Sequence, residues 1–176
     1  MAAYEVRRFR VGEWRQFRDI RLEALKDTPI GFGEWYEDAA ARTEQEWRER
    51  TERAAAAERA ALFAAIDADG RFVGTAGVFP MPASAEDREF VIYGVYVTPD
   101  HRGPQRGIVS LLFDAVIAWA REVGGADVIS LTVHERNDRA HAFYRRYGFV
   151  DTGKQIPYVL DESAALIEMR LAEPTG

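Results

Sequence analysis

The first third of the chain shows two kinds of hydrophobic spacing, one typical of a strand and one typical of helices. Residues 4–9 alternate between apolar and polar side chains, which is the period-two pattern of an edge strand. A helix is expected over residues 11–25, where four large apolar side chains recur at helical spacing: Trp14, Phe17, Leu22 and Leu25. A second helix is expected over residues 43–58, because Thr43 and Glu46 form a capping-box pattern. The segment between these helices reads as a loop rich in aromatic and acidic residues.

The middle of the chain predicts a hairpin followed by a central strand. Residues 62–66 and 72–79 are apolar runs separated by the turn-forming residues 67–70, a pattern typical of two antiparallel strands. Residues 81–88 read as a loop. Residues 90–97 are almost continuously apolar or aromatic, as in a strand that is covered on both faces. We therefore expect this strand in the middle of the sheet.

A helix that ends at Gly124 and Gly125 follows the central strand. Its expected buried stripe consists of Leu112, Val116, Trp119 and Val123. Residues 127–133 then read as a strand. Because a helix joins this strand to the strand at 90–97, the crossover should be right-handed and the two strands parallel.

The last part of the chain predicts a short helix and a final strand pair. The helix is expected over residues 137–147 and the strands over residues 149–152 and 166–171. No internal repeat or linker interrupts the pattern. One α/β domain spanning residues 1–176 accommodates all the predicted elements.

Composition and charge then narrow the function classes. The chain has 176 residues, 47% of them hydrophobic, and a net charge of −6, which argues against binding to duplex nucleic acid. It contains no cysteine, which excludes disulfides, thiolate zinc sites and a cysteine nucleophile. Its three histidines are scattered, and no carboxylate motif accompanies them, so we expect no metal.

The first residues lack the apolar core of a signal peptide, and no stretch approaches the length of a membrane span. We therefore expect no membrane association and a cytoplasmic location. Lysine occurs only at Lys26 and Lys154 among many arginines, which suggests a G+C-rich bacterial source. The sequence leaves the oligomeric state undecided, with a homodimer kept open.

The segment 137–149 carries the most specific chemistry. At about 100° per residue, a step of seven positions returns to nearly the same face of a helix, so Asn137 and Tyr144 should face one ligand. Asn137 could equally serve as the helix N-cap. Tyr144 could equally be a core aromatic beside Phe143.

A glycine-rich turn at residues 99–110 lies between the central strand and its helix. Glycines let the backbone approach an anion, a helix amino terminus offers unpaired N–H groups, and Arg102 and Arg106 add charge. The turn therefore suits a pyrophosphate, although an ordinary strand-to-helix turn is the alternative. It is neither a Walker motif nor a dinucleotide fingerprint, because it lacks both glycine patterns.

Together these two segments resemble the GNAT superfamily of acetyl-CoA-dependent N-acetyltransferases. The family's carboxyl-terminal motif, N-x-x-A-x-x-[FY]-Y-x-x-x-G-F, is matched at Asn137, Ala140, Phe143, Tyr144, Gly148 and Phe149. Its cofactor motif, V-x-P-x-x-R-G-x-G-x-G/A, is similar to the turn at Val97, Pro99, Arg102 and Gly103. Residues 21–33 are similar to the opening segment of many small bacterial members.

The resemblance implies a GNAT-like α+β (α/β) fold. Its mixed central sheet would have about six to seven strands flanked by about four helices, with a splayed parallel strand pair at the cofactor site. The residues implied to bind acetyl-CoA are Val95, Val97, Arg102, Gly103, Arg106, Gly107, Ile108, Val109, Asn137, Phe143 and Tyr144. Within this set, Val95 and Val97 would offer backbone groups to the pantetheine arm, and Asn137 would bind the arm from the helix side.

The turn departs from the family pattern. The insertion of Pro104, Gln105 and Arg106 before Gly107 lengthens it by about two residues, and Pro104 has no N–H to donate. The amides expected to meet the pyrophosphate are those of Arg106, Gly107, Ile108 and Val109.

The resemblance also implies a mechanism. Tyr144 would be the general acid that protonates the departing coenzyme A thiolate. Family members often carry a glutamate base on the central strand, but residues 90–97 contain no carboxylate, so Glu89, Glu34 and His134 stay open as bases. The absence of cysteine removes an acyl-cysteine intermediate and leaves direct transfer in a ternary complex.

The implied substrate groove lies between the loop near residues 28–38 and the last strand pair. Glu34 and Tyr158 are expected to bind the amine, because carboxylates beside aromatic rings attract a protonated amine. Further aromatic and acidic residues of this region are Phe32, Trp35, Tyr36, Glu37, Asp38, Asp161 and Glu162. The alternative is that the acids are only solvated surface groups.

We therefore expect an acetyl-CoA-dependent N-acetyltransferase that acts on a primary amine, and more specifically on a small cationic molecule. One alternative is a protein amino-terminal acetyltransferase, which would need an open groove for an extended peptide. The other is a coenzyme A-binding regulatory module without turnover.

Overall fold

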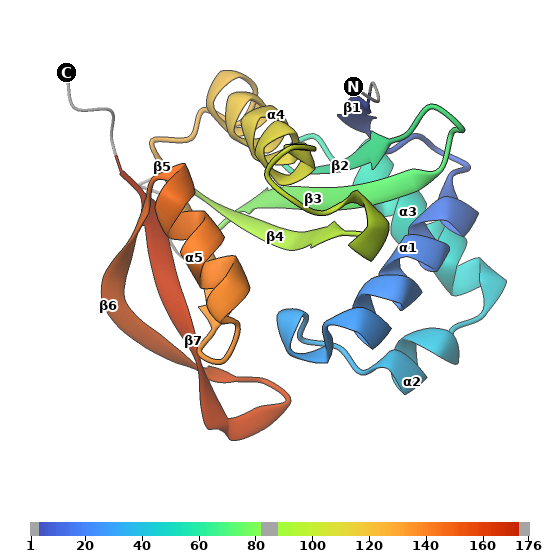
Figure 1. Cartoon of the computed structure of the whole chain (residues 1–176). Coiled ribbons are helices and arrows are strands. Elements are labelled where there is room, and N and C mark those ends of the chain that lie inside the picture. The colour runs from blue at the N-terminus through green and yellow to red at the C-terminus, as the bar shows by residue number, and fades with distance from the viewer. Residues whose placement is uncertain (1–3, 82–87, 173–176) are drawn as a thin grey trace.

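The computed structural model describes residues 4–81 and 88–172, which form one mixed sheet with helices on both faces (Figure 1). Seven strands of these residues pair in the order β1-β2-β3-β4-β5-β7-β6. The strands are β1 (Glu5–Arg8), β2 (Ala61–Ile66), β3 (Phe72–Pro80), β4 (Glu89–Val97), β5 (Val128–His134), β6 (Phe149–Tyr158) and β7 (Asp161–Leu171). The helices are α1 (Trp14–Asp27), α2 (Tyr36–Ala40), α3 (Glu44–Ala56), α4 (Ile108–Glu122) and α5 (Asp138–Tyr147), with 3-10 turns η1 (Pro29–Gly31) and η2 (Pro99–His101).

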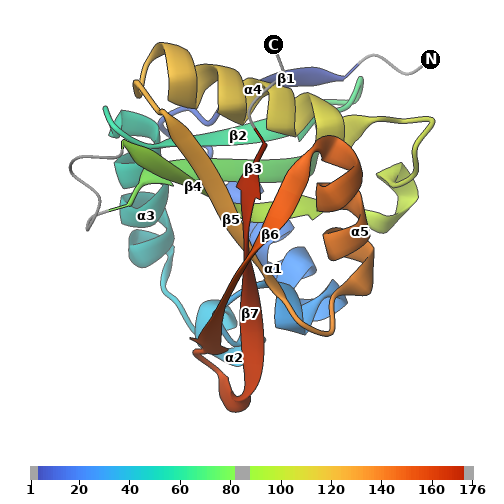
Figure 2. The same cartoon turned by 90° about the vertical axis from the view of Figure 1, so that its left-hand side faces the viewer.

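Two hydrophobic cores lie on opposite faces of the sheet. One lies beneath α4 and α5 and is centred on Phe113 and Leu112, which are fully buried. The other lies beneath α1 and α3 and contains Trp14, Phe17 and Trp47. All six residues of β2 are buried because its alternate side chains enter the two cores in turn. Figure 2 shows α4 along one side of the strands and α1, α2 and α3 on the other.

The predicted fold class is confirmed, and most predicted elements form. The hairpin of β2 and β3 is antiparallel, and β4 lies at the centre of the sheet and runs parallel to β5. The capping box at α3 also forms: Thr43 accepts a hydrogen bond from the Glu46 amide, and the Glu46 carboxylate accepts one from the Thr43 amide. Most of the predicted loop at 81–88 lies outside the described residues.

Three sequence-based expectations about the elements were wrong. Val123 does not complete the buried stripe of α4, because the helix ends at Glu122 and the Val123 side chain is 62% exposed. Residues 36–40 form the short helix α2 instead of a loop. The final strand pair is much longer than predicted, since β6 continues through Gly153 and Pro157. Both residues are tolerated because β6 is an edge strand with a register shift between Asp151 and Gln155.

The parallel contact between β4 and β5 is short, and this positions the site. The two strands pair only from Glu89 to Ile92 on β4 and from Val128 to Leu131 on β5. Beyond that point β5 stays paired with β7 as far as His134, while β4 stays paired with β3 as far as Val97. The strands therefore part at their carboxyl ends.

A bulge in β4 accompanies the parting of the strands. Gly94 has a φ of 62°, a left-handed conformation that glycine adopts without strain. The β3–β4 register also shifts there, because Thr75 pairs with Tyr96 whereas Gly77 pairs with Tyr93. The Thr75 hydroxyl donates a hydrogen bond to the Gly94 carbonyl over 2.9 Å, which holds the bulge in place. Downstream of the buried residues 89–92, Tyr93 is 40% exposed and Gly94 and Val95 are only partly buried, so β4 is not covered evenly on both faces.

An ion cluster around Glu34 ties together the helices on one face of the sheet. Its carboxylate accepts hydrogen bonds from Arg21 of α1, Arg50 of α3 and Arg42, which lies between α2 and α3. The nitrogen–oxygen distances are 2.8 Å for Arg21 and 3.1 Å for Arg50. Burial alone would raise the pKa of Glu34, but the hydrogen bonds from the three guanidinium groups outweigh it and lower the pKa to about 2.

Glu34→Gln should lower the free energy of unfolding at neutral pH. It should also make that free energy depend less on pH in the acid range. Because the folded pKa lies below the ordinary value of 4.5, the contribution of Glu34 is complete above that pH and is lost as the pH falls toward 2. The shift corresponds to a difference on the order of 3 kcal/mol in the free energy of unfolding. Urea unfolding at a series of pH values measures this difference.

Glu44→Gln is the matched control for this experiment. Glu44 also pairs with an arginine, Arg48, but its side chain is 54% exposed, so its loss should change stability by less than about 1 kcal/mol. If the free energy of unfolding of Glu34→Gln fell with decreasing pH as steeply as that of the wild type, the lowered pKa assigned to Glu34 would be contradicted.

Candidate active site

A cavity of about 870 Å³ opens where β4 and β5 part. Its walls come from the carboxyl halves of these strands, the turn before α4, the inner face of α5, η1, and the turn between β6 and β7. This volume lies within the range of about 300–1,000 Å³ typical of small-molecule sites. Of the residues predicted to bind cofactor, Val95, Val97, Arg102, Gly103, Gly107, Ile108, Val109, Asn137, Phe143 and Tyr144 line this cavity.

The beginning of α4 supplies unpaired backbone amides to the cavity. Gly107 is the N-cap residue with a φ of 64°, and no side chain caps the helix. The first helical hydrogen bond runs from the Leu111 amide to the Gly107 carbonyl, so the amides of Ile108, Val109 and Ser110 have no partner within the helix. Such amides, together with the positive end of the helix dipole, favour an anion.

Two amides of the lengthened turn form hydrogen bonds within the turn itself. This corrects the expectation that the amides of Arg106 and Gly107 meet the pyrophosphate. The amides of Arg106 and Gly107 both donate to the Gly103 carbonyl, over 3.2 and 3.4 Å. They close the turn, so only the three amides that follow are available to an anion. The Arg106 side chain lies outside the cavity lining and donates to the Tyr4 hydroxyl.

Arg102 holds the turn in position. Its Nε donates to the Val97 carbonyl over 2.7 Å, and its other nitrogens pair with Asp27 at the end of α1. Burial would raise the pKa of Asp27, but the hydrogen bonds from Arg102 and Thr28 and the nearby positive charges together outweigh it, so the pKa is lowered. Arg102 therefore links β4, the turn and α1, and its charge is already paired.

Asn137 acts as the N-cap of α5 and also lines the cavity. Its side-chain oxygen accepts a hydrogen bond from the Ala140 amide over 3.3 Å. The amide nitrogen of the same side chain has no hydrogen-bond partner among the described residues, and it remains free to donate. The capping interpretation is confirmed, and it is compatible with a ligand-binding role.

Tyr144 is held by aromatic packing while its hydroxyl stays unpaired. The ring stacks on Phe113 with centroids 5.6 Å apart and also contacts Phe143 and Phe149. Within the described part of the chain the hydroxyl makes no hydrogen bond, although the residue lines the cavity. Burial raises the pKa of Tyr144 above its usual value, so the phenol keeps its proton at neutral pH.

None of the three residues considered as the base offers a free lone pair to the cavity. Glu89 begins β4 at the paired end of the strands, where it is buried against Arg170 at 3.3 Å. Glu34 is enclosed by its three arginines and does not line the cavity. His134 does line the cavity, but its Nδ1 accepts a hydrogen bond from the Arg136 amide, so the neutral ring carries its proton on Nε2.

Tyr158 joins the last strand pair to the loop after α1. Its hydroxyl donates to the Phe32 carbonyl over 3.0 Å, and its ring meets His134 edge-on at 4.8 Å. The ring lines the cavity as expected, but the hydroxyl is already engaged. The other aromatic and acidic residues expected in the groove, Trp35, Tyr36, Glu37, Asp38, Asp161 and Glu162, are absent from the cavity lining.

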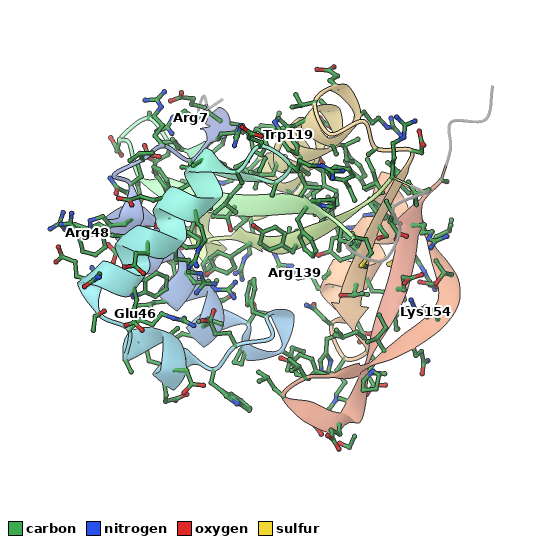
Figure 3. The ribbon with its side chains drawn as sticks, turned by 180° about the vertical axis from the view of Figure 1, so that it is seen from behind. Arg7, Glu46, Arg48, Trp119, Arg139 and Lys154 are labelled. Atoms are coloured by element: carbon green, nitrogen blue, oxygen red, sulfur yellow. The ribbon has the colours of Figure 1, made fainter. Side chains whose placement is uncertain are left out.

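Sequence reasoning missed several lining residues, among them the charged residues Arg21, Arg139 and Arg146. Arg139 and Arg146 lie seven positions apart on α5, as Asn137 and Tyr144 do, and this shared spacing was the signal available for them. Arg139 also contributes to lowering the pKa of Asp27. Figure 3 shows Arg139 near the middle of the molecule, between the α1 side and the β7 side.

Within residues 4–81 and 88–172, no group of three or more histidine, aspartate or glutamate side chains could hold a metal ion. No helix in the same ranges is both long and apolar enough to cross a membrane.

Comparison with known proteins identifies the family. The model of the acetyltransferase (GNAT) family matches residues 14–149. No curated protein sequence matches the chain significantly.

Solved structures share the fold. A GNAT-family acetyltransferase from Streptococcus pneumoniae is 18% identical, with a TM-score of 0.75, and the match covers 96% of this chain and 98% of that one. The spermidine N-acetyltransferase from Vibrio cholerae, solved with CoA and spermine, is 16% identical with a TM-score of 0.74, over 96% and 94% of the two chains. A nourseothricin acetyltransferase is 27% identical over 65% of this chain and 66% of its own, with a TM-score of 0.57. The protein described here belongs to the GNAT family of acetyltransferases.

Proposed function

We propose that the protein transfers the acetyl group of acetyl-CoA directly to a primary amine, with Tyr144 as the general acid. The observation that carries this proposal is the protonated hydroxyl of the buried Tyr144 side chain, which has no hydrogen-bond partner among the described residues and lines the cavity between the parted strands. The same cavity contains the free amides at the start of α4. An anion-binding end and a proton donor therefore share one space.

The cavity walls suggest how the cofactor binds. The amides of Ile108, Val109 and Ser110 would receive the pyrophosphate, and Arg139 and Arg146 would add charge for the phosphates. The edge of β4 at Val95 and Val97 has no ladder partner on the β5 side, and it would pair with the pantetheine arm. Asn137 would donate its free amide to the same arm, and Phe143 would pack beside it.

In the transfer, the amine nitrogen bonds to the thioester carbonyl carbon and the carbon–sulfur bond breaks. Tyr144 donates its phenolic proton to the departing sulfur, and its raised pKa means that the phenol carries this proton at neutral pH. The amine must also lose a proton. Since Glu89, Glu34 and His134 present no free lone pair, we propose that water in the cavity accepts that proton.

The proposal is limited to a primary amine. The expectation of a cationic acceptor rested on the acids of the groove. Glu34 is neutralised by arginines, and the other acids, Glu37, Asp38, Asp161 and Glu162, lie outside the cavity lining. The described residues that line the cavity include no aspartate or glutamate. The Vibrio cholerae structure contains spermine, but at 16% identity the likeness supports the shared fold and not this acceptor.

A first test measures coenzyme A release from acetyl-CoA across a panel of primary amines. Turnover with at least one amine is expected. Tight binding of acetyl-CoA without release of thiol from any amine would favour a regulatory module instead.

Tyr144→Phe should lower kcat by about 10²–10⁴-fold, because it removes the proton donor and leaves the aromatic packing intact. The Kd of acetyl-CoA should change by less than about threefold, since the hydroxyl makes no contact that holds the site together. Steady-state kinetics and calorimetry measure the two effects separately.

Tyr147→Phe is the matched control for Tyr144→Phe. Tyr147 lies on the same helix, but its hydroxyl is committed to Asp114. Its kcat should stay close to that of the wild type. The general-acid assignment fails if Tyr144→Phe turns over normally or if both variants lose activity equally.

Substitutions of Asn137 separate its capping role from its binding role. Asn137→Ser keeps a good helix cap and should change stability by less than about 0.5 kcal/mol, yet raise the Kd of acetyl-CoA by about fivefold to tenfold. Asn137→Ala should additionally lose about 1 kcal/mol of stability. Unchanged affinity in Asn137→Ser would show that Asn137 serves only as a cap.

A further inference from the structure

A small side pocket of about 80 Å³ adjoins the main cavity. It shares Arg21, Phe32, Tyr93 and Gly94 with the larger cavity, so it lies beside the bulge where β4 leaves β5. Arg50 of α3 also lines it, and the rest of its wall is largely apolar. A space of this size accommodates a group as small as a carboxylate.

The pocket is positively charged although it is mostly enclosed. Arg21, Arg42 and Arg50 share the single carboxylate of Glu34, which leaves two positive charges without a partner in the cluster. The exposed fractions of the Arg21 and Arg50 side chains are only 16% and 30%. Glu46 also acts on Arg42, but it is exposed and bonded to Thr43 (Figure 3). Glu46 therefore does not neutralise the pocket.

Both lining arginines keep N–H groups that Glu34 does not use. Arg21 directs Nε and Nη2 to Glu34, and Arg50 directs both of its Nη atoms to it. For Arg21 Nη1 and Arg50 Nε, the described residues supply no hydrogen-bond partner. A desolvated guanidinium group with free donors is a strong site for a planar anion.

The positive charges of Arg21 and Arg50 act on Tyr93, which lines the main cavity. Burial raises the pKa of Tyr93, and the positive charges of Arg50 and Arg21 offset part of that rise. Tyr93 lines both spaces, next to the bulge at Gly94. An anion in the side pocket would therefore lie next to the space between the parted strands.

We propose that the acceptor carries an anionic group, such as a carboxylate, in addition to its amine, and that this group binds in the side pocket against Arg21 and Arg50. The substrate class is thus an amino acid or a similar amine bearing an acid, in place of the cationic amine expected from the sequence. The inference rests on the proposed function only in that the amine of this acceptor becomes acetylated. The anion site itself is defined by the arginines and the pocket.

Matched pairs of amines test the proposal. Each pair consists of an amino acid and the amine that remains when its carboxylate is replaced by hydrogen. Calorimetry with protein saturated with coenzyme A measures the affinity of each compound, and thiol release measures its kcat/KM. In at least one pair, the carboxylate-bearing compound should bind about tenfold or more tightly than its partner, because its carboxylate would form charge-assisted hydrogen bonds with the two arginines.

Two arginine variants locate the site. Arg50→Gln removes a charge that lines the pocket, and it should reduce the preference for the carboxylate, measured as the ratio of the two affinities, by about tenfold. Arg42→Gln removes a charge that also pairs with Glu34 but lies outside the pocket, so it should retain the preference. Arg50→Lys keeps the charge but loses the planar guanidinium group, so its affinity ratio should lie between those of the two glutamine variants.

The outcomes separate this inference from the proposed function. Equal affinity within every pair overturns the anion site, even if some amine is acetylated. Equal loss of preference in Arg42→Gln and Arg50→Gln overturns the assignment to the pocket. A carboxylate preference in binding without any thiol release supports the anion site and contradicts acetyl transfer.

Discussion

The site depends on one backbone constraint, the early end of the ladder between β4 and β5. A strand can pair on both edges only while its neighbours run alongside it, and here the two strands follow different partners after Ile92 and Leu131. β5 remains with β7, and β4 remains with β3 through the bulge at Gly94. The unpaired edge of β4 would be costly if it were buried without a partner, and a ligand able to form hydrogen bonds along it removes that cost. The opening between the strands is therefore both a cavity and a binding edge.

Aromatic packing positions Tyr144 at this opening, and the start of α4 positions the free amides there. Phe113 of α4 contacts Phe143, Tyr144, Tyr147 and Phe149, which fixes α5 against α4. This packing holds Tyr144 in the cavity wall without using its hydroxyl. The free amides of α4 lie in the same cavity, because the lengthened turn satisfies its own amides and leaves the next three unpaired. The proposed anion site and the proposed proton donor thus lie on adjoining helices that share one core.

The distribution of charge differs from what the net charge of −6 suggests. The described cavity lining contains arginines and histidines but no carboxylate. Glu34 and Asp27, which contact arginines of the cavity wall, are each paired with those arginines. A net charge describes the whole surface, whereas recognition in an enclosed site depends on the few charges that remain unpaired there. This contrast explains why the acids of the sequence suggested a cationic acceptor, whereas our proposal places an anionic group on the acceptor.

The sequence by itself determined the fold class, the order of the elements and the residues of the motif from Asn137 to Phe149. These features depend on local patterns: hydrophobic period, the capping box at Thr43, turn residues and fixed spacing along a helix. Tertiary structure alone decided which arginines meet Glu34, which amides of the turn stay free and how far β6 extends past Gly153. Each of these depends on groups brought together from distant elements, whose distances and burial no local pattern encodes. For that reason Tyr144 could be identified from its spacing, whereas the charged pocket beside Tyr93 became visible only in the folded chain.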